Sequence, residues 1–595
     1  MLRHALIALM LSAPLLRAEP AARLVWQPVQ KYFIRKNGGT PPSQGTRRLN
    51  SFTSYTHLGT DFGFHGPAEH EIEWVEDWIT VRLGQQPDAW AGMWHSLAGQ
   101  AKHPEKAMDF MRAFPEPIVP AFQPRVSAVR LEASGRGKIK LEIKSRSEEV
   151  RWTQTVTLQN EAAQMFVLPV SSEMHRDAKF LIWTAEPGSE VRVSGLYLGM
   201  EMPALPWDAH AFLTSYAKLL RCYTIRSGFV RDRAHIDDGS FESVSATGMF
   251  VLATAAAARE PLGIVKDDYA RWVLRQTHEA VKRVRTARGL LPHFVWQIGG
   301  EYQIHPNTEY SSVDSAIYFQ SMLLAARMLG NEAIETELTD MVRKVDFDML
   351  HLPSGHLSHG VKDDGTTLLP HGWRDWGGET ALVMLLERMA HPHRRMPPVD
   401  RPGRAWQGSG FITEIQSLFH PDFDSDDGDL QDGVHWRGVR RLMLGAQRAY
   451  FPNTMPKSLA ARLGIYGLSA GENEFGNAYH VGGTDLPDQR LIHPHYILMS
   501  ATMAENTGDV LALLERMEKA GFFPPWGMVE NLTADGQSHL PMEGGLNAAF
   551  EALGAYHLLA RHRGIPDAIY NASRESPFIR QAMRLYYDGG RGESR

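Results

Sequence analysis

The chain is long enough to form more than one hydrophobic core, and its composition is that of a globular protein. It has 595 residues, of which 43% are hydrophobic and 22% are charged. A formal net charge of -6 gives nucleic acid no electrostatic reason to bind. The single cysteine, Cys222, excludes an internal disulfide framework and a cysteine-based metal site. The aromatic content of 10% is compatible with flat platforms for sugars, and equally with large cores.

The N-terminus has the order of a secretory signal segment. A short basic start is followed by an apolar run over 5–16, and Ala18 is the predicted last residue removed. Leu16 departs from this pattern, so an ordinary N-terminal helix is the alternative. No later apolar stretch reaches the length of a membrane-spanning helix. We expect residues 1–18 to be a signal peptide, and the mature protein to be secreted or periplasmic without membrane insertion.

Residues 24–204 have the alternating pattern of short strands. Apolar residues repeat at every second position, and turn residues separate the segments. The clearest segments are 126–133, 138–144, 152–158, 165–170 and 191–198. We predict an antiparallel β-sandwich. Carbohydrate binding is one interpretation of its tryptophans, and a role in core packing is the other.

From about residue 205 the apolar residues recur at three and four, which is the spacing of helices. The predicted helices cover 208–221, 241–258, 267–286, 312–329, 331–348, 378–390, 434–450, 492–504, 507–520, 544–563 and 575–588. About a dozen helices in antiparallel pairs would close into an all-α (α/α)6 toroid over 205–590, with loops gathered at one face. A helical solenoid is disfavoured because the sequence has no fixed period.

Five loops between these helices are rich in carboxylates and aromatic side chains. The candidate residues are Arg231, Asp232 and Asp237 in the first loop, Glu309 in the second, Trp373, Asp375, Trp376 and Glu379 in the third, Tyr466 and Glu472 in the fourth, and Trp526, Glu530 and Glu543 in the fifth. Glycoside cleavage requires two carboxyl groups, an acid for the leaving oxygen and a base or nucleophile opposite. The loops supply candidates for both.

Helix capping explains the neighbours of Glu309 but not Glu309 itself. Ser311 or Ser312 can cap the following helix, and Asp314 suits its first turn. Glu309 precedes the cap, where partial desolvation would raise its pKa and keep the carboxyl group protonated. We therefore predict that Glu309 is the catalytic acid.

Asp232 lies between Arg231 and Arg233, and these two cations would hold its carboxyl group ionised. Such a group can orient a hydroxyl group of a ligand or fix the loop. A surface ion pair is the alternative interpretation.

Two of these segments carry a resemblance to a known family. The segment from Ser227 to Arg233 is similar to S-G-L-V-x-D-R, and the segment from Glu309 to Ala316 matches E-x-S-S-[IV]-D-[ST]-A. On this basis the stretch from about 215 to 565 resembles the glycoamylase-like six-hairpin glycosidases, which include bacterial endo-β-1,2-glucanases. Weaker similarity continues at Trp373, Trp376 and Glu379, and from Tyr466 to Glu472. The segment around Glu530 departs from the family's Y-G-F-Y-D-A-F pattern, and the strand-rich region lies outside the resemblance.

The resemblance implies hydrolysis of a β-linked glucan or a related polysaccharide, with inversion. It implies that Glu309 is the general acid and that Glu530 or Glu472 is the base. No cofactor and no metal ion is expected. Two alternatives stay open: a glycan-binding protein that has lost catalysis, and a polysaccharide lyase. A lyase would need a Tyr or His base in a cationic site, which these acidic loops disfavour.

Two patterns could indicate a metal ion. Residues 422–429 resemble a calcium loop, but the glycine is one place late and no glutamate closes the loop. A solvated acidic loop is therefore the preferred interpretation. The histidine pairs His356/His359 and His493/His495 lack a third ligand, so zinc is not expected.

Overall fold

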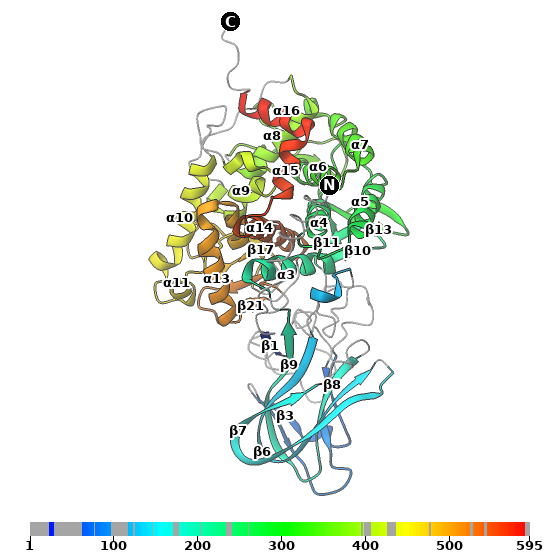
Figure 1. Ribbon diagram of the computed structural model, residues 1–595, viewed down its shortest axis with the longest axis vertical. Coiled ribbons are helices and arrows are strands. Elements are labelled where there is room, and N and C mark those ends of the chain that lie inside the picture. Colours follow the sequence, from blue (N-terminus) through cyan, green and yellow to red (C-terminus); the bar gives the residue numbers. More distant parts are fainter. Residues whose placement is uncertain are drawn as a thin grey trace, which may run out of the picture.

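A computed structural model describes residues 23–28, 62–75, 78–96, 117–122, 125–145, 147–170, 178–203, 205–233, 241–259, 261–375, 377–393, 397, 406–424, 436–474, 478–523, 527–540 and 544–588. The predicted signal segment, residues 1–18, lies outside these ranges. Within the described ranges, no helix combines the length and the apolar character needed to cross a membrane. The chain forms a strand region followed by a helical region (Figure 1).

The strand region is one antiparallel sheet built around a long central strand. Its strands are β1 (Arg23–Pro28), β2 (Phe62–His65), β3 (Ile72–Val75), β4 (Trp78–Arg82), β5 (Ala91–Ser96), β6 (Arg125–Ser145), β7 (Val150–Pro169), β8 (Ala178–Ala185) and β9 (Glu190–Met202). Strand β6 pairs with β9 along its first half and with β8 along its second half. The order β2-β5-β8-β6-β9-β4-β3 follows from this sharing. Alternate residues of β6, such as Leu131 and Leu141, are fully buried, which confirms the predicted period of two.

The segments predicted at 126–133 and 138–144 form one strand instead of two. The chain between them does not turn. Gly135 and Gly137 lie inside β6, where both adopt positive φ values. The pairing register with β7 shifts between Ala133 and Gly135, as in a β-bulge. The segments 152–158 and 165–170 likewise belong to one strand, β7. Glycines that suggest a turn in the sequence therefore bend a continuous strand.

The helical region begins at Trp207, shortly after β9 ends at Met202. Its helices are α3 (Trp207–Cys222), α4 (Val244–Ala257), α5 (Asp267–Val281), α6 (Ser312–Met328), α7 (Glu332–Arg343), α8 (Gly378–Ala390), α9 (Gly410–Glu414), α10 (Trp436–Thr454), α11 (Leu459–Leu463), α12 (His495–Met499), α13 (Thr507–Lys519), α14 (Gly545–Arg563), α15 (Ala568–Glu575) and α16 (Pro577–Asp588). The predicted helix at 492–504 is shorter than expected, since only α12 is α-helical there. Helices α9, α11 and α15 were not predicted.

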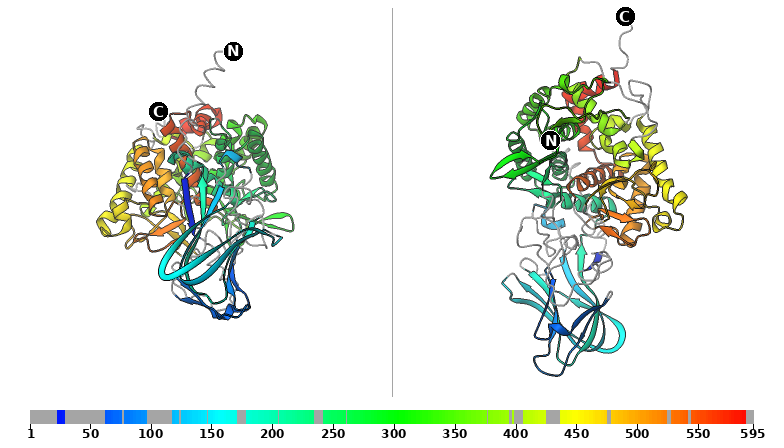
Figure 2. Two further views of the ribbon diagram at one scale, coloured as in Figure 1. Left: turned by 60° about the horizontal axis from the view of Figure 1, so that its bottom comes forward. Right: turned by 180° about the vertical axis from the view of Figure 1, so that it is seen from behind.

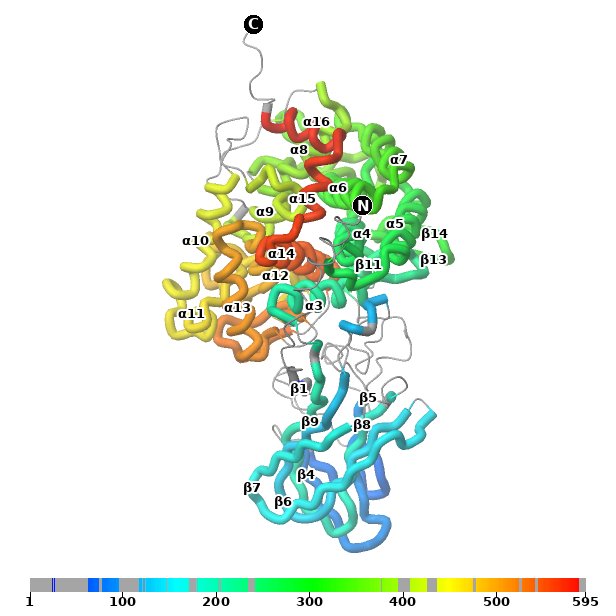
Figure 3. The backbone as a smooth tube through the Cα atoms, in the orientation of Figure 1, coloured from blue at the N-terminus to red at the C-terminus, as the bar shows by residue number. Residues whose placement is uncertain are grey.

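Six helices form the interior of this region. Helix α4 contacts α6, α6 contacts α8, α8 contacts α9, α9 contacts α12, α12 contacts α14, and α14 contacts α4 again. Helices α4, α6 and α14 are buried on nearly all sides, whereas α5 and α7 bury one face only. Figure 3 shows α5 and α7 on the outside of α4 and α6. The helices therefore separate into an inner set and an outer set.

The strand region contacts the helical region through a short segment as well as through the chain connection. The backbone N–H of Val119 donates to the carbonyl oxygen of Ile264 at 2.9 Å. Val119 precedes a short 3-10 helix, Pro120–Phe122, which the second view of Figure 2 shows between the two regions.

Candidate active site

The loops that precede the inner helices meet through short strand pairs. Strand β15 (Glu309–Ser311) leads directly into α6 and pairs with β16 (Gly360–Lys362). Strand β17 (Ala470–Glu472) pairs with β18 (Tyr479–Val481) before α12. The N–H of Gly545, the first residue of α14, donates to the carbonyl oxygen of Asp232 at 2.7 Å. These bonds bring segments from distant parts of the sequence to one end of the inner helices.

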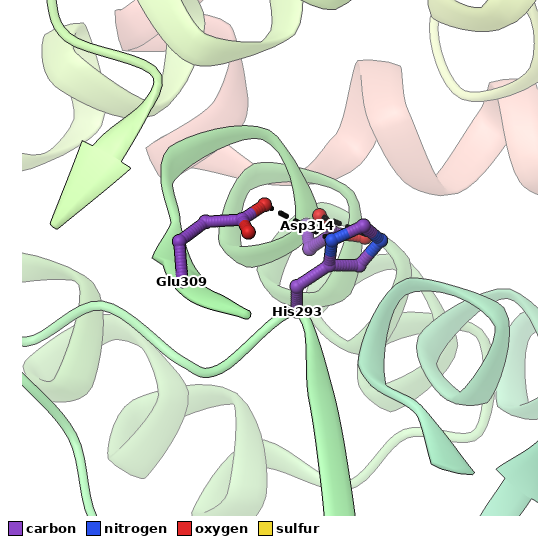
Figure 4. Close-up of side chains that lie close together, drawn as sticks. All are labelled: His293, Glu309 and Asp314. Carbon is purple, nitrogen blue, oxygen red and sulfur yellow. Dashed lines mark hydrogen bonds and ion pairs between the residues drawn. The ribbon is translucent and has the colours of Figure 1, made fainter. Parts of the chain in front are cut away.

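Glu309 lies beside a histidine that the sequence did not single out. Its carboxylate Oε1 is 3.0 Å from Nδ1 of His293, and its carbonyl oxygen accepts from the N–H of His293 at 2.9 Å. On the other side of the ring, Nε2 of His293 is 3.8 Å from Oδ2 of Asp314. Figure 4 shows the ring of His293 beside the carboxyl groups of Glu309 and Asp314. Ser311 caps α6 by accepting from the N–H of Asp314, so capping fixes Asp314 as predicted.

The pKa of Glu309 shifts in the opposite direction to the one predicted from the sequence. Burial alone would raise the pKa of Glu309, but the hydrogen bond and the positive charge of His293 outweigh it and lower that pKa. Burial would lower the pKa of His293, but Asp314 and then Glu309 raise it to about 9. The predicted rise in the pKa of Glu309 is therefore wrong. At neutral pH the pair holds one proton, and that proton is on His293.

His293, Glu309 and Asp314 also offer ligand atoms close enough for a metal ion. The two carboxylates, however, face opposite nitrogens of one imidazole ring. Nδ1 is 3.0 Å from Oε1 of Glu309, so a metal ion at this nitrogen would have to replace the contact between the two side chains. The geometry suits proton sharing through the ring.

A second carboxyl group, Glu472, lies at the edge of the same site and binds Arg233. The Nε and Nη2 atoms of Arg233 are 2.6 and 2.5 Å from Oε1 of Glu472. Burial raises the pKa of Glu472 to about 7, because the charge of Arg233 is offset by that of Glu530 and Asp232. Arg233 is 3.8 Å from Asp232. Burial raises the pKa of Asp232 despite Arg233, which is the opposite direction to the shift expected from its arginine neighbours.

Glu530 lies beneath the strand that carries Glu472. Its Oε1 accepts from the backbone N–H of Glu472 at 3.3 Å and from Nδ2 of Asn547 at 2.5 Å. A Cβ atom at Gly471 would lie 2.8 Å from this oxygen, so the glycine permits the close approach. Burial raises the pKa of Glu530, and Lys218 opposes the rise. The Oε2 atoms of Glu472 and Glu530 are both buried and have no hydrogen-bond partner within the described ranges.

Glu379 and Tyr479 interact electrostatically with the carboxyl groups described above. Glu379 is in the first turn of α8, where burial and then the charges of Asp375 and Asp314 raise its pKa to about 8. Tyr479, which pairs with Glu472 across β17 and β18, is 63% exposed. Burial of its hydroxyl group raises the pKa of Tyr479. The pKa is raised further by the negative charges of Glu379, Asp232, Asp314 and Glu472. The charges of carboxyl groups from four different segments therefore act on the hydroxyl group of Tyr479.

Other predicted site residues lie in the interior or outside the described ranges. Trp373 is buried, and its Nε1 donates to Oγ of Ser312 at 2.8 Å. Tyr466 is also buried, with its hydroxyl group 3.0 Å from Oγ of Ser500. Both side chains pack within the protein, so direct contact with a substrate is not supported. Arg231 is buried next to Glu242. Asp237, Trp376, Trp526 and Glu543 fall outside the described residues.

The residues of the two metal patterns bond to other protein groups wherever the structure describes them. Asp424 accepts from Nη1 of Arg440 at 3.1 Å, and residues 425–429 of the calcium-like segment lie outside the described ranges. His493 donates through Nε2 to the carbonyl oxygen of Glu472 at 3.0 Å, which helps to fix the end of β17. Nε2 of His495 is 3.0 Å from Oγ of Ser469. Both histidines therefore support the protein's own hydrogen bonding.

Sequence reasoning missed His293, Arg233 and Tyr479 as members of the site. His293 precedes a strand and has no helix-start pattern around it. Its only signal was the aromatic residue that follows, Phe294. Arg233 was considered only as a neighbour of Asp232. Tyr479 was noted as lying close to Glu472 in sequence, and the β17–β18 pairing is what brings them opposite each other.

The fold is similar to solved glucanases and glucoamylase-like proteins. No protein-family model matches the sequence, and curated proteins give no match either. A β-1,2-glucanase from Parabacteroides distasonis is 10% identical, with a TM-score of 0.54 over 86% of this chain and 92% of its own. A candidate glucoamylase from Bacteroides caccae is 13% identical, with a TM-score of 0.53 over 64% and 99%. An endo-β-1,2-glucanase from Chitinophaga pinensis, in complex with sophorotriose and glucose, is 12% identical, with a TM-score of 0.52 over 64% and 99%.

These matches show that the chain has the fold of this group of proteins. A match over 64% of the chain is close to the length of the helical region, from α3 to α16. A match over 86% is longer and includes part of the strand region. The strand region was expected to lie outside the resemblance. Instead, the combination of a strand region and a helical region recurs in the glucanase from Parabacteroides distasonis.

Proposed function

We propose that the protein is a glycoside hydrolase that cleaves a β-linked glucan by inversion, with Glu309 as the acid. The observation that carries the proposal is the pairing of carboxyl groups in different protonation environments. Glu309 is hydrogen-bonded to His293, whereas Glu530 accepts a hydrogen bond from the backbone N–H of Glu472. Glycoside cleavage requires such a division between an acid and a base.

In the proposed reaction, Glu309 gives a proton to the leaving glycosidic oxygen and takes its own proton from Nδ1 of His293. The existing 3.0 Å separation of Nδ1 and Oε1 allows this transfer. The carbon–oxygen bond to the leaving sugar breaks, and water forms a new bond to the same carbon from the opposite face. The proton released by that water passes to the base.

The base in the proposal is Glu472, assisted by Glu530. Their Oε2 atoms are buried acceptors that have no hydrogen-bond partner in the described part of the chain. A buried acceptor without a partner is costly, so a water molecule bound between the two carboxyl groups would stabilise both. Arg233 favours the ionised form of Glu472, which the base requires. Glu472 is 6% exposed and Glu530 2%, so Glu472 is the less deeply buried of the two.

The proposed substrate is a β-1,2-glucan or a glucan with a related linkage. Similarity of fold to two β-1,2-glucanases supports this choice. We also propose that the inner and outer helices form the predicted (α/α)6 toroid, which the returning contacts from α4 to α14 support. The N-terminal segment is proposed as a signal for export. The start of the mature protein after expression would test this, with Glu19 as the expected first residue.

The test is to incubate the purified protein with β-1,2-, β-1,3- and mixed-linkage glucans and to measure new reducing ends. We expect reducing ends from at least one of them, and most from the β-1,2-glucan. Binding without new reducing ends would favour a glycan-binding protein. Products that absorb in the ultraviolet, formed from a uronate polymer, would favour a lyase. Either result would overturn the proposal.

A further inference from the structure

A hairpin of two strands extends directly from the catalytic group. Strand β13 (Phe294–Ile298) begins at the residue after His293 and pairs with β14 (Glu301–Ile304). Side chains at alternate positions share a face, so Phe294, Trp296 and Ile298 lie on the same side of β13. Trp296 is 37% exposed and Ile298 is 51% exposed. Figure 1 shows β13 projecting at the edge of the helical region.

Aromatic rings connect His293 with Trp296 along this face. The ring of His293 stacks on Phe294, with centroids 3.8 Å apart. Phe294 contacts Phe241 at 4.5 Å, and Phe241 contacts His305 at 4.7 Å. His305 meets the ring of Trp296 edge-on at 4.4 Å. The rings therefore form a continuous path of ring contacts from His293 to the surface.

Polar side chains lie opposite Trp296 and Ile298, at the exposed end of this path. Gln303 lies directly opposite Trp296 in the strand register, and Glu301 lies opposite Ile298. Both Gln303 and Glu301 are exposed. A pyranose ring has an apolar face and a rim of hydroxyl groups, so an indole ring beside an amide and a carboxylate offers complementary contacts. A protein partner would more commonly require a larger continuous apolar patch.

We propose that this face of the β13–β14 hairpin binds the glucan chain as it leaves the catalytic group, with Trp296 as the platform for one sugar. The proposal rests on the proposed function and adds a binding subsite to it. Trp296 is three residues from His293, which corresponds to roughly 10 Å along a strand. Long substrates reach this platform, and the shortest substrates do not. The hairpin thereby gives the protein its preference for chain length.

The test compares Trp296→Ala with the wild-type protein on a long glucan and on the shortest oligosaccharide that is cleaved. We expect KM for the long glucan to rise roughly 3- to 10-fold, in line with the loss of one aromatic contact, with kcat unchanged. KM for the short substrate should not change. Trp296→Phe should retain part of the affinity because it keeps a ring. Leu442→Ala, at an exposed leucine on α10, is the control and should change neither value.

Equal KM values for Trp296→Ala and the wild type on both substrates would overturn the inference while leaving the proposed function intact. A rise of KM on both substrates by the same factor would also overturn it, since it would indicate general damage to the site. Binding can be measured apart from catalysis in the Glu309→Gln background, by calorimetric titration with the long glucan. We expect Trp296→Ala to weaken this binding by the same factor. A wild-type protein that cleaves no glucan would contradict the proposed function. Independently of that result, the subsite would be contradicted if Trp296→Ala left the binding of the long glucan unchanged.

Discussion

Glu309 and Glu472 are both partly buried carboxyl groups beside a cation, yet their pKa values shift in opposite directions. Glu309 has one close partner, His293, whose charge and hydrogen bond outweigh burial. Glu472 is hydrogen-bonded to Arg233 at least as closely, but its side chain is only 8% exposed, compared with 29% for Glu309. It also lies beside Glu530 and Asp232. An ion pair therefore does not by itself decide the protonation of a carboxyl group. Burial and like charges next to it can reverse the result.

The largest effect is expected when the acid side of this comparison is removed. Glu309→Gln keeps the size of the side chain but cannot deliver a proton to the leaving oxygen. We expect kcat to fall by about 10²-fold or more, as for the loss of a general acid. Steady-state kinetics on the best glucan measure this. Glu332→Gln, at an exposed glutamate in the first turn of α7, is the matched control and should leave kcat unchanged. Full activity of Glu309→Gln would remove Glu309 from the mechanism.

The next largest effect is expected on the pH profile when His293, which holds the proton of the pair, is changed. The pair retains its proton up to a pH near the pKa of His293, which is raised to about 9, so the alkaline limb of the pH profile should lie there. In His293→Asn the proton must be held by Glu309 alone, whose ordinary pKa is far lower. The alkaline limb should move to lower pH, and activity on that limb should fall about tenfold for each unit of the shift. An unchanged pH profile would show that His293 only supports the structure.

A smaller shift is expected on the acidic limb when Arg233 is changed. The base must be ionised, and burial raises the pKa of Glu472 to about 7, so activity should decline below that pH. Arg233→Lys keeps the positive charge but loses the two contacts through Nε and Nη2. The pKa of Glu472 should rise further, and the acidic limb should move to higher pH by less than about one unit. A limb that moves to lower pH would contradict the assignment of Glu472.

The smallest effect is expected on stability. The pKa of Glu379 is raised from its ordinary value to about 8, so the folded protein binds more protons than the unfolded chain between those two pH values. Folding stability should therefore decrease as pH rises through this range. Glu379→Gln removes the effect, and its Tm should exceed that of the wild type by about 1–3 °C more at pH 9 than at pH 6. A Tm difference that is equal at both pH values would contradict the raised pKa.

The sequence predicted the helices and the loops well because these features depend on local patterns. The apolar period predicts α5 and α7, which bury one face, and Ser311 with Asp314 gives the start of α6. The bulge at Gly135 was mistaken for a turn, since a glycine with positive φ fits both in a sequence. Helix α9 was missed because it has only five residues.

The site was predicted in part, for a related reason. Glu309, Glu472 and Glu379 were found because they precede or begin helices in acidic loops. The protonation of these carboxyl groups could not be predicted, because it depends on contacts between residues far apart in the sequence, such as Arg233 with Glu472. His293 and Glu309 lie sixteen positions apart, and only the pairing of the neighbouring backbone segments brings them together. Trp373 and Tyr466 illustrate the opposite error, since an aromatic residue in a polar loop can still be buried.

The central claim is that Glu309 and the Glu472–Glu530 pair act from opposite faces of a β-linked sugar. The most direct measurement is proton NMR of the wild-type protein acting on β-1,2-glucan, recorded before the new reducing ends equilibrate. We expect these ends to form first as the α-anomer, because water attacks the face opposite to the departing β-linked sugar. Reducing ends that form first as the β-anomer, or no reducing ends from any β-glucan, would contradict it.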